Sequence, residues 1–103
     1  MKVLISKGFG AGWSTWNYKE MAVDKDLINL FEKGCTEEEM AELCVKKGYT
    51  SLFSGDPYMG GFSDLVVEEV PKGCYFKIRE YDGAESIEIF DSSHWLFAED
   101  WYV

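Results

Sequence analysis

The tightest constraint on the fold is an Asp-Gly pair at residues 82–83, which lies between two runs of alternating apolar and polar residues. Asp-Gly favours a two-residue turn of type I′, because both central residues of that turn need a positive φ. The turn fixes the pairing of the flanking runs and sets Ile78 opposite Ile87. A shift of one residue would set Ile78 opposite Glu88. The sequence therefore predicts an antiparallel hairpin with strands at 74–81 and 85–91.

Two short helices are predicted in the first half of the chain. Asp24 is a favourable N-cap for the first helix, which carries apolar residues at helical spacing and ends at Gly34. The second helix begins with a capping box, in which Thr36 and Glu39 each bond the other's backbone, and it ends at Gly48. The short connection between the helices predicts a helical hairpin or corner.

Three further strands complete the predicted fold, at 2–6, 65–70 and 95–98. The elements together predict an α+β protein, with a mostly antiparallel sheet of four to five strands and two short helices packed on it. A length of 103 residues predicts a single domain over 1–103.

The chain is acidic, with 19 acidic and 10 basic residues and a formal net charge of −9. Duplex nucleic acid is not expected as a partner, because binding to its phosphates needs clustered lysine and arginine. The charge is uneven, since residues 1–55 carry −1 and residues 56–103 carry −8. The acidic half either mimics DNA and occupies a basic groove of another protein, or serves solubility alone.

Cysteine and hydropathy indicate the compartment. The three cysteines are an odd number and no secretory signal is evident, so we expect reduced thiols in a cytoplasm. No apolar run approaches the roughly 18 residues that span a membrane, so no membrane is expected. Cys44 lies among apolar helical residues and is predicted to be core. A zinc site would need Cys35, Cys44, Cys74 and His94, but no Cys-x-x-Cys pair supports it, and no cofactor is expected.

A glycine-rich loop follows the first predicted strand, with glycines at 8, 10 and 12. It matches neither the dinucleotide fingerprint nor the Walker A motif. The loop could form a cradle, in which backbone amides with Ser14 and Thr15 hold phosphate or ribose while Trp13 or Trp16 stacks a base. Alternatively, the glycines are turn residues and the tryptophans cover the sheet.

Two other segments could bind a ligand. Residues 58–62 form either an aromatic binding loop or an ordinary surface connection. The outer face of the predicted hairpin carries Tyr75, Lys77, Arg79 and Tyr81 at alternate positions. Arg79, the only arginine, could grip a phosphate or carboxylate, or pair with Glu88 across the strands.

Catalysis has little support in the sequence. His94 is the only histidine, and a dyad with Cys74 has no residue beside it that would activate either group. We therefore expect a protein without enzymatic activity.

Three segments resemble a group of small proteins of tailed phages and prophages of Gram-positive bacteria. They are KVLISKGFGAGWSTWN, TEEEMAELCVKKG and EEVPKGCYFKIREYDGAESIEIF, which together span much of the chain. The resemblance implies a counter-defence factor. One such class sequesters nucleotide immune signals, and another comprises small acidic inhibitors of the anti-CRISPR type.

The resulting hypothesis is a non-enzymatic phage protein that binds and sequesters an ADP-ribose-type or cyclic-nucleotide signal. The alternative is an acidic inhibitor of a host defence protein. The aromatic content of 17% favours a homo-oligomer. The expected ligand-binding residues, as base stackers, amide donors, polar contacts and phosphate contacts, are Lys7, Phe9, Gly10, Ala11, Gly12, Trp13, Ser14, Thr15, Trp16, Asn17, Arg79 and Tyr81.

Overall fold

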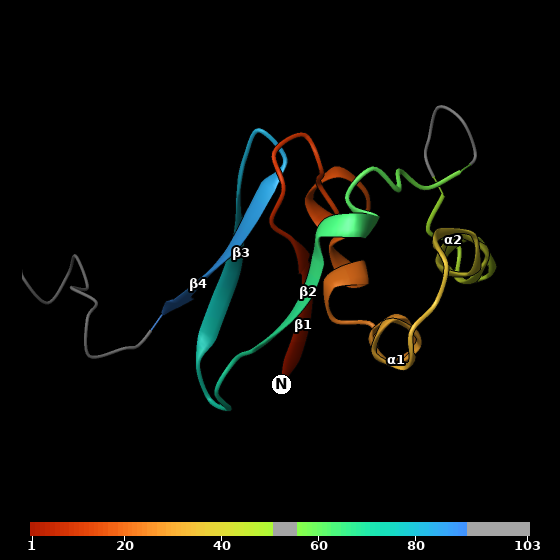
Figure 1. The fold of residues 1–103 in the computed structure, drawn as a ribbon. Coiled ribbons are helices and arrows are strands. Elements are labelled where there is room, and N and C mark those ends of the chain that lie inside the picture. The colour runs from red at the N-terminus through yellow and green to blue at the C-terminus, as the bar shows by residue number, and fades with distance from the viewer. Residues whose placement is uncertain (51–55, 91–103) are drawn as a thin grey trace, which may run out of the picture.

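The computed structural model describes residues 1–50 and 56–90, and the α+β class predicted from the sequence is confirmed there (Figure 1). The strands are β1 (Lys2–Ser6), β2 (Leu65–Glu69), β3 (Tyr75–Tyr81) and β4 (Ala84–Phe90), the helices are α1 (Lys25–Lys33) and α2 (Glu37–Lys46), and the 3-10 turns are η1 (Ser14–Trp16), η2 (Lys19–Ala22) and η3 (Phe62–Asp64). The strand predicted at 95–98 lies outside the described residues.

The hairpin register is the one that the turn predicts. Ile78 pairs with Ile87 and Lys77 with Glu88, and Asp82 has the positive φ, 50°, that a type I′ turn requires. The remaining pair, β1 and β2, is also antiparallel. The four described strands therefore form two separate two-stranded sheets rather than one continuous sheet.

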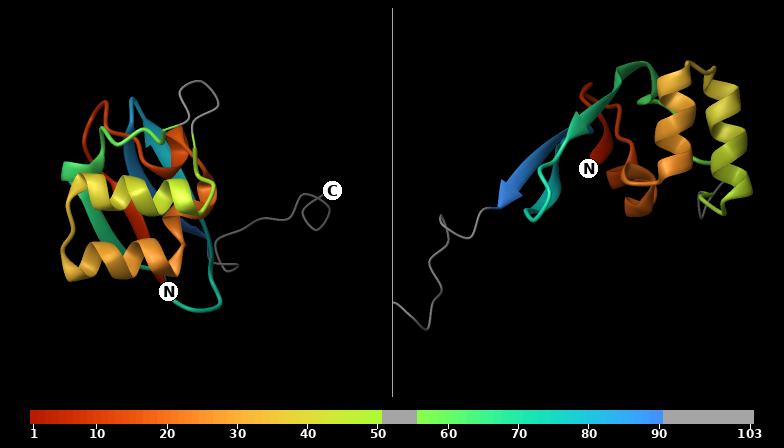
Figure 2. Two further views of the ribbon diagram at one scale, coloured as in Figure 1. Left: turned by 90° about the vertical axis from the view of Figure 1, so that its right-hand side faces the viewer. Right: turned by 90° about the horizontal axis from the view of Figure 1, so that it is seen from below.

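The two sheets and the helices form three layers. In Figures 1 and 2 the β3–β4 hairpin lies on one side of β1–β2, and α1 and α2 lie on the other. The helix side is packed around a core of Leu4, Trp13, Met21, Leu27, Ile28, Met40, Cys44 and Leu65. A smaller core of Val3, Ile5, Ala22 and Val70 meets Phe76, Ile78 and Ile87 of the hairpin.

Strand β1 is buried on both faces. Its middle residue Leu4 belongs to the helix-side core, whereas Val3 and Ile5 belong to the hairpin-side core, and all three are fully buried. This position explains the uninterrupted apolar run, because a strand covered on both sides does not alternate. The β1–β2 sheet and the β3–β4 sheet therefore meet face to face through side chains, and no ladder of backbone hydrogen bonds joins their described strands.

The helix termini follow the predicted capping signals. The Asp24 carboxylate accepts hydrogen bonds from the amides of Asp26 and Leu27, and the capping box of Thr36 and Glu39 is complete. Cys44, on α2, is buried in the core as predicted. The helices form the expected hairpin, and each helix contributes residues to the helix-side core.

Candidate functional site

The glycine-rich loop of residues 8–17 is bonded to the turn of the β3–β4 hairpin. The amide of Gly10 donates to the Asp82 carbonyl at 2.5 Å, and the amide of Gly12 donates to the Gly83 carbonyl at 2.7 Å. The Ala11 amide donates within the loop, to the carbonyl of Gly8. The three amides expected to hold a phosphate therefore already have acceptors in this chain.

The backbone of the glycine-rich loop lies so close to the hairpin turn that residue 83 must be glycine. A Cβ atom at Gly83 would lie 2.8 Å from the Ala11 nitrogen, which is closer than such atoms approach in proteins. Gly83 also has a φ of +87°, so it is required both by the turn and by the contact. The glycine-rich loop and the hairpin turn thus fit as one unit.

The loop does hold an anion, and that anion is the side chain of Glu85. This side chain is only 2% exposed. One carboxylate oxygen accepts from the Ser6 amide at 3.0 Å, and the other accepts from the amides of Trp13 and Thr15, also at 3.0 Å. The Thr15 hydroxyl completes the set at 2.6 Å. Four donors thus surround one buried carboxylate, and burial of a charged group requires hydrogen bonds of this kind.

The role of Glu85 was missed at the sequence level, although the predicted register contained a signal for it. That register sets Glu80 opposite Glu85, on the same face as Ile78 and Ile87. Like charges directly opposite are unfavourable, so two glutamates on an inward face require donors from elsewhere. Glu80 takes its donors from the Trp16 indole at 3.2 Å and the Gly83 amide at 2.6 Å.

The two tryptophans of the loop have different positions. Trp13 is fully buried in the helix-side core, and its indole N–H lies 3.4 Å from the Met21 carbonyl. It cannot stack on a ligand in solvent without leaving that core. Trp16 is 42% exposed, and its ring lies 5.2 Å from that of Tyr58.

The segment at 58–62, predicted as a second binding loop or a surface connection, lies against the first loop. The Asn17 amide group donates to the Tyr58 carbonyl at 3.0 Å and accepts from the Tyr58 amide at 2.9 Å. The Tyr58 hydroxyl donates to the Gly10 carbonyl at 2.7 Å. Asn17, an expected ligand contact, thus joins the two loops.

The remaining expected residues lie apart from one another. The Lys7 ammonium pairs with Glu68 at 2.6 Å, and the Arg79 guanidinium pairs with Glu88 across the hairpin. Phe9 and Tyr81 form an exposed edge-to-face pair with ring centroids 6.3 Å apart. The structure therefore distributes the twelve expected residues over a core, a cradle and a surface rather than one pocket.

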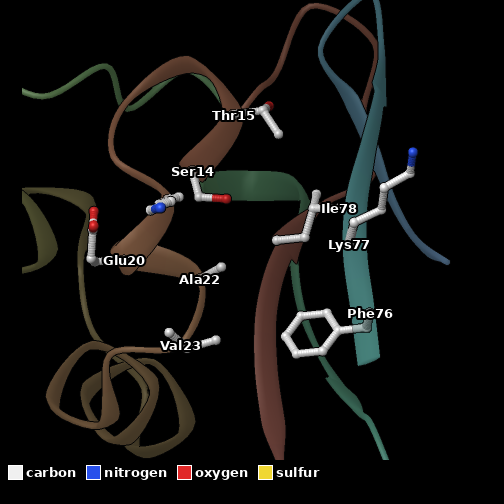
Figure 3. A pocket seen from close by; sticks show the side chains of 9 residues that line it. Ser14, Thr15, Glu20, Ala22, Val23, Phe76, Lys77 and Ile78 are labelled. Carbon is white, nitrogen blue, oxygen red and sulfur yellow. The ribbon is translucent and has the colours of Figure 1, made fainter. Parts of the chain in front are cut away.

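A hollow of about 420 Å³ lies between the segment containing η1 and η2 and strand β3 (Figure 3). Figure 3 shows Phe76 and Ile78 pointing into it from β3, whereas the ammonium of Lys77 points away. Only two of the twelve expected residues, Ser14 and Thr15, reach it. Its lining is Ser14, Thr15, Lys19, Glu20, Ala22, Val23, Phe76, Lys77 and Ile78.

A second hollow, of about 550 Å³, adjoins the first at Val23, which lines both. Lys2 and Lys25 lie along it, although Lys2 is paired with Glu32 at 2.8 Å. Four lysines line the two hollows, although the Lys77 ammonium points away from the first, and among the described residues Glu20 is the only acidic one in either lining. No local sequence pattern indicates this grouping, because the lysines come from three separate segments.

Other site chemistry is sparse over residues 1–50 and 56–90. No group of three histidine, cysteine, aspartate or glutamate side chains is placed to bind a metal ion there. The thiols of Cys35, Cys44 and Cys74 are free, and burial raises the pKa of Cys44 to about 12, so that thiol is unreactive. His94 lies outside the described residues.

No helix within the described part of the chain has the length and apolar character needed to cross a membrane. Comparison of the chain with protein-family models, with curated proteins and with solved structures finds no match in any of the three.

Proposed function

We propose that this chain is a non-enzymatic binding protein that sequesters a nucleotide-derived anion in the hollow between η1–η2 and β3. The observation that best supports this proposal is the set of residues that line the hollow. Phe76, Ile78, Ala22 and Val23 offer an apolar wall for a base, and its volume lies within the usual range for small-ligand sites. The Ser14 hydroxyl and the Lys19 ammonium supply polar contacts for ribose and phosphate. The Thr15 hydroxyl donates to Glu85, so toward a ligand it can only accept, as from a ribose hydroxyl.

The charge distribution supports an anionic ligand at this place. The chain carries −9, so most of its surface repels phosphate. Lys19 in the first hollow and Lys25 in the second make this region an exception. A ligand with two phosphate groups could reach Lys19 in the first hollow and Lys25 in the second, as an ADP-ribose-type or cyclic dinucleotide ligand would.

The proposal differs from the sequence-level hypothesis in the place of the ligand. The amides of residues 10–12 have acceptors within the chain, and Glu85 fills the cradle, so the ligand is assigned to the far side of η1. The sequence resemblance to small phage proteins supports a counter-defence role, in which binding removes the signal from the host cytoplasm.

Isothermal titration calorimetry with ADP-ribose, cyclic di-AMP and AMP tests this function. We expect micromolar binding of at least one of the first two, and a rise in melting temperature by linkage. Lys19→Gln should weaken that binding about tenfold, because one charge-assisted contact contributes roughly 1.5 kcal/mol. Lys46→Gln is the matched control, since this exposed lysine on α2 removes the same charge away from the hollow.

Two results would contradict the proposal. One is the absence of heat and of any melting shift with all three ligands at millimolar concentration. The other is an equal loss of affinity in the Lys19 and Lys46 variants, which would show that only the net charge matters and that the hollow is not the site.

A further inference from the structure

Four exposed aromatic side chains lie, as two contacting pairs, where the glycine-rich loop, the 58–62 segment and the hairpin turn come together. This aromatic rim consists of Phe9, Trp16, Tyr58 and Tyr81. Phe9 and Tyr81 are 76% and 77% exposed, and Trp16 and Tyr58 are about 40% exposed. Figure 1 shows the glycine-rich loop and the hairpin turn side by side at one end of the molecule. Exposed apolar side chains gathered in one place indicate a contact surface.

The rim is held in place before any partner arrives. Gly10 lies at its centre, because its carbonyl accepts from the Tyr58 hydroxyl and its amide donates to Asp82, next to Tyr81. The indole N–H of Trp16 is fixed by Glu80. The Trp16 and Tyr58 side chains, which are already bonded, lose little entropy on binding, and this favours affinity.

Carboxylates surround the rim. Glu80 bonds the Trp16 indole, Asp82 lies in the turn beside Tyr81, and the Asp64 side chain lies against Gly8, next to Phe9. The neighbouring cation, Lys7, is paired with Glu68. The rim therefore combines aromatic faces with negative charge, which is the opposite of the lysine-lined hollows.

We propose that the aromatic rim binds an arginine-bearing segment of a partner protein. A guanidinium stacks on aromatic faces and pairs with carboxylates, and it is more weakly hydrated than an ammonium. A phosphate would be repelled by the same carboxylates, which argues against a nucleotide at this place. The proposal is independent of the ligand assigned to the hollow, because it rests on other residues.

Fluorescence anisotropy with a labelled nine-residue peptide of alternating arginine and glycine tests the rim. The matched peptide replaces each arginine with citrulline, which has the same shape and no charge. We expect measurable binding at 50 mM NaCl and at least tenfold weaker binding of the citrulline peptide. The corresponding lysine peptide should bind severalfold more weakly than the arginine peptide.

Variants separate the rim from the general acidity of the chain. The double variant Phe9→Ala/Tyr81→Ala should weaken binding about tenfold, since two aromatic contacts to a cation are lost. Tyr75→Ala is its control, because Tyr75 is equally exposed at the opposite end of the hairpin.

Asp82→Asn removes one charge and keeps a turn residue that tolerates positive φ, so it should weaken binding about threefold. Glu38→Gln, on exposed α2, should change binding less than twofold.

Several outcomes would overturn the proposal. They are equal binding of the citrulline peptide, equal effects of the Phe9/Tyr81 and Tyr75 variants, and no binding at 1 mM peptide. Analytical ultracentrifugation tests a further outcome. If the wild type is a dimer, the Phe9/Tyr81 variant is a monomer and no peptide binds, the rim is a contact with a second copy of this chain. Weaker nucleotide binding in that variant, again without peptide binding, would assign it to the ligand.

Discussion

At the scale of single residues, Glu85 connects segments that lie far apart in the sequence. Its carboxylate joins β4 to the end of β1 and to the glycine-rich loop, and all of its hydrogen bonds come from residues at least 70 positions away. A carboxylate that accepts charge-assisted bonds in a buried place contributes more than a surface ion pair does. Conversely, loss of the side chain leaves buried N–H groups without acceptors.

Glu85→Gln should lower the free energy of unfolding by about 1–3 kcal/mol. The substituted amide keeps one acceptor oxygen but turns an N–H toward the buried amide of Ser6 or toward the donors of Trp13 and Thr15. Urea denaturation of the purified variant measures the loss. Glu88→Gln, in the exposed pair with Arg79, is the control and should cost less than about 1 kcal/mol. Equal losses in the two variants would show that Glu85 has no special structural role.

Residue roles were predicted unevenly. Asp24, Thr36 and Glu39 were recognised because a cap and its partner amides lie within three residues of each other. The role of Glu85 was not recognised, because the N–H and O–H groups that donate to its carboxylate lie far away in the sequence. Trp13 was assigned to a binding site because its type suits stacking, whereas its burial depends on packing that no local pattern shows.

At the scale of elements, the side chain of Asp24 links the two helices through hydrogen bonds. Beyond capping α1, its carboxylate accepts from the Lys47 ammonium at 2.9 Å and from the Tyr49 hydroxyl at 2.8 Å, just after α2. Burial and the hydrogen bond to Asp24 raise the pKa of Tyr49 to about 12. Burial also raises the pKa of Asp24, but the bonds from Lys47, Tyr49 and the backbone outweigh it, so the net pKa is lowered from its ordinary value of 3.8.

This lowered pKa predicts a dependence of helix stability on pH. Ionised Asp24 stabilises the fold above its unfolded pKa, and the contribution is lost as the pH falls through the lower folded pKa. Asp24→Asn keeps a good N-cap and removes the charge, so we expect it to cost about 1–2 kcal/mol at pH 7. The difference from wild type should shrink as the pH falls below 3.8, the ordinary pKa of an aspartate, and through the lower folded pKa. Urea denaturation at several pH values measures it, and a difference independent of pH would contradict the assignment.

A second prediction concerns the contact between the hairpin turn and the glycine-rich loop. Gly83 and Gly73 both have φ near +85°, but only at Gly83 would a Cβ meet the backbone of residues 10 and 11. Gly73→Ala should therefore cost about 1 kcal/mol, through strain alone. Gly83→Ala should cost clearly more, above about 2 kcal/mol, because the loop must also move. Similar melting temperatures for the two variants would show that the contact is unimportant.

The described helices and strands were predicted within a residue or two because their signals are local. The Asp-Gly turn sets the β3–β4 register, and caps and glycines set the ends of α1 and α2. The 3-10 turns η1, η2 and η3 were not predicted. Each has only three or four residues, which is too short to show a hydrophobic period.

At the scale of the whole molecule, the hairpin is a separate layer with two kinds of attachment. Apolar side chains of Phe76, Ile78 and Ile87 pack on the hairpin side of β1–β2, and polar bonds fix the turn end. No described backbone ladder joins the two sheets. The sequence predicted these strands and the pairing of β3 with β4, but it did not predict the pairing of β1 with β2 or the division into two sheets. Both of these depend on contacts between segments far apart in the chain, which no local pattern shows.

Hydrogen exchange should reveal this layering. In Glu85→Ala we expect the amides of β3 and β4 to exchange faster by a larger factor than those of α1 and α2, because the polar attachment of the hairpin is lost while the helix-side core is kept. Mass spectrometry of peptides spanning residues 75–90 and 25–46 makes the comparison. Uniform acceleration in both regions would show that the molecule opens only as one unit.

The position of Glu85 has a consequence for protein engineering. Residues 8–17 look like a self-contained segment, yet their shape is completed by a side chain more than 65 positions further along the chain. A graft of the loop alone onto another scaffold would carry amide donors without their carboxylate. Those donors would take up whatever anion the buffer supplies, so the recipient would gain affinity for small ions rather than the rigid loop seen here. Only a transplant that includes both the loop and the strand bearing Glu85 would carry the structure intact.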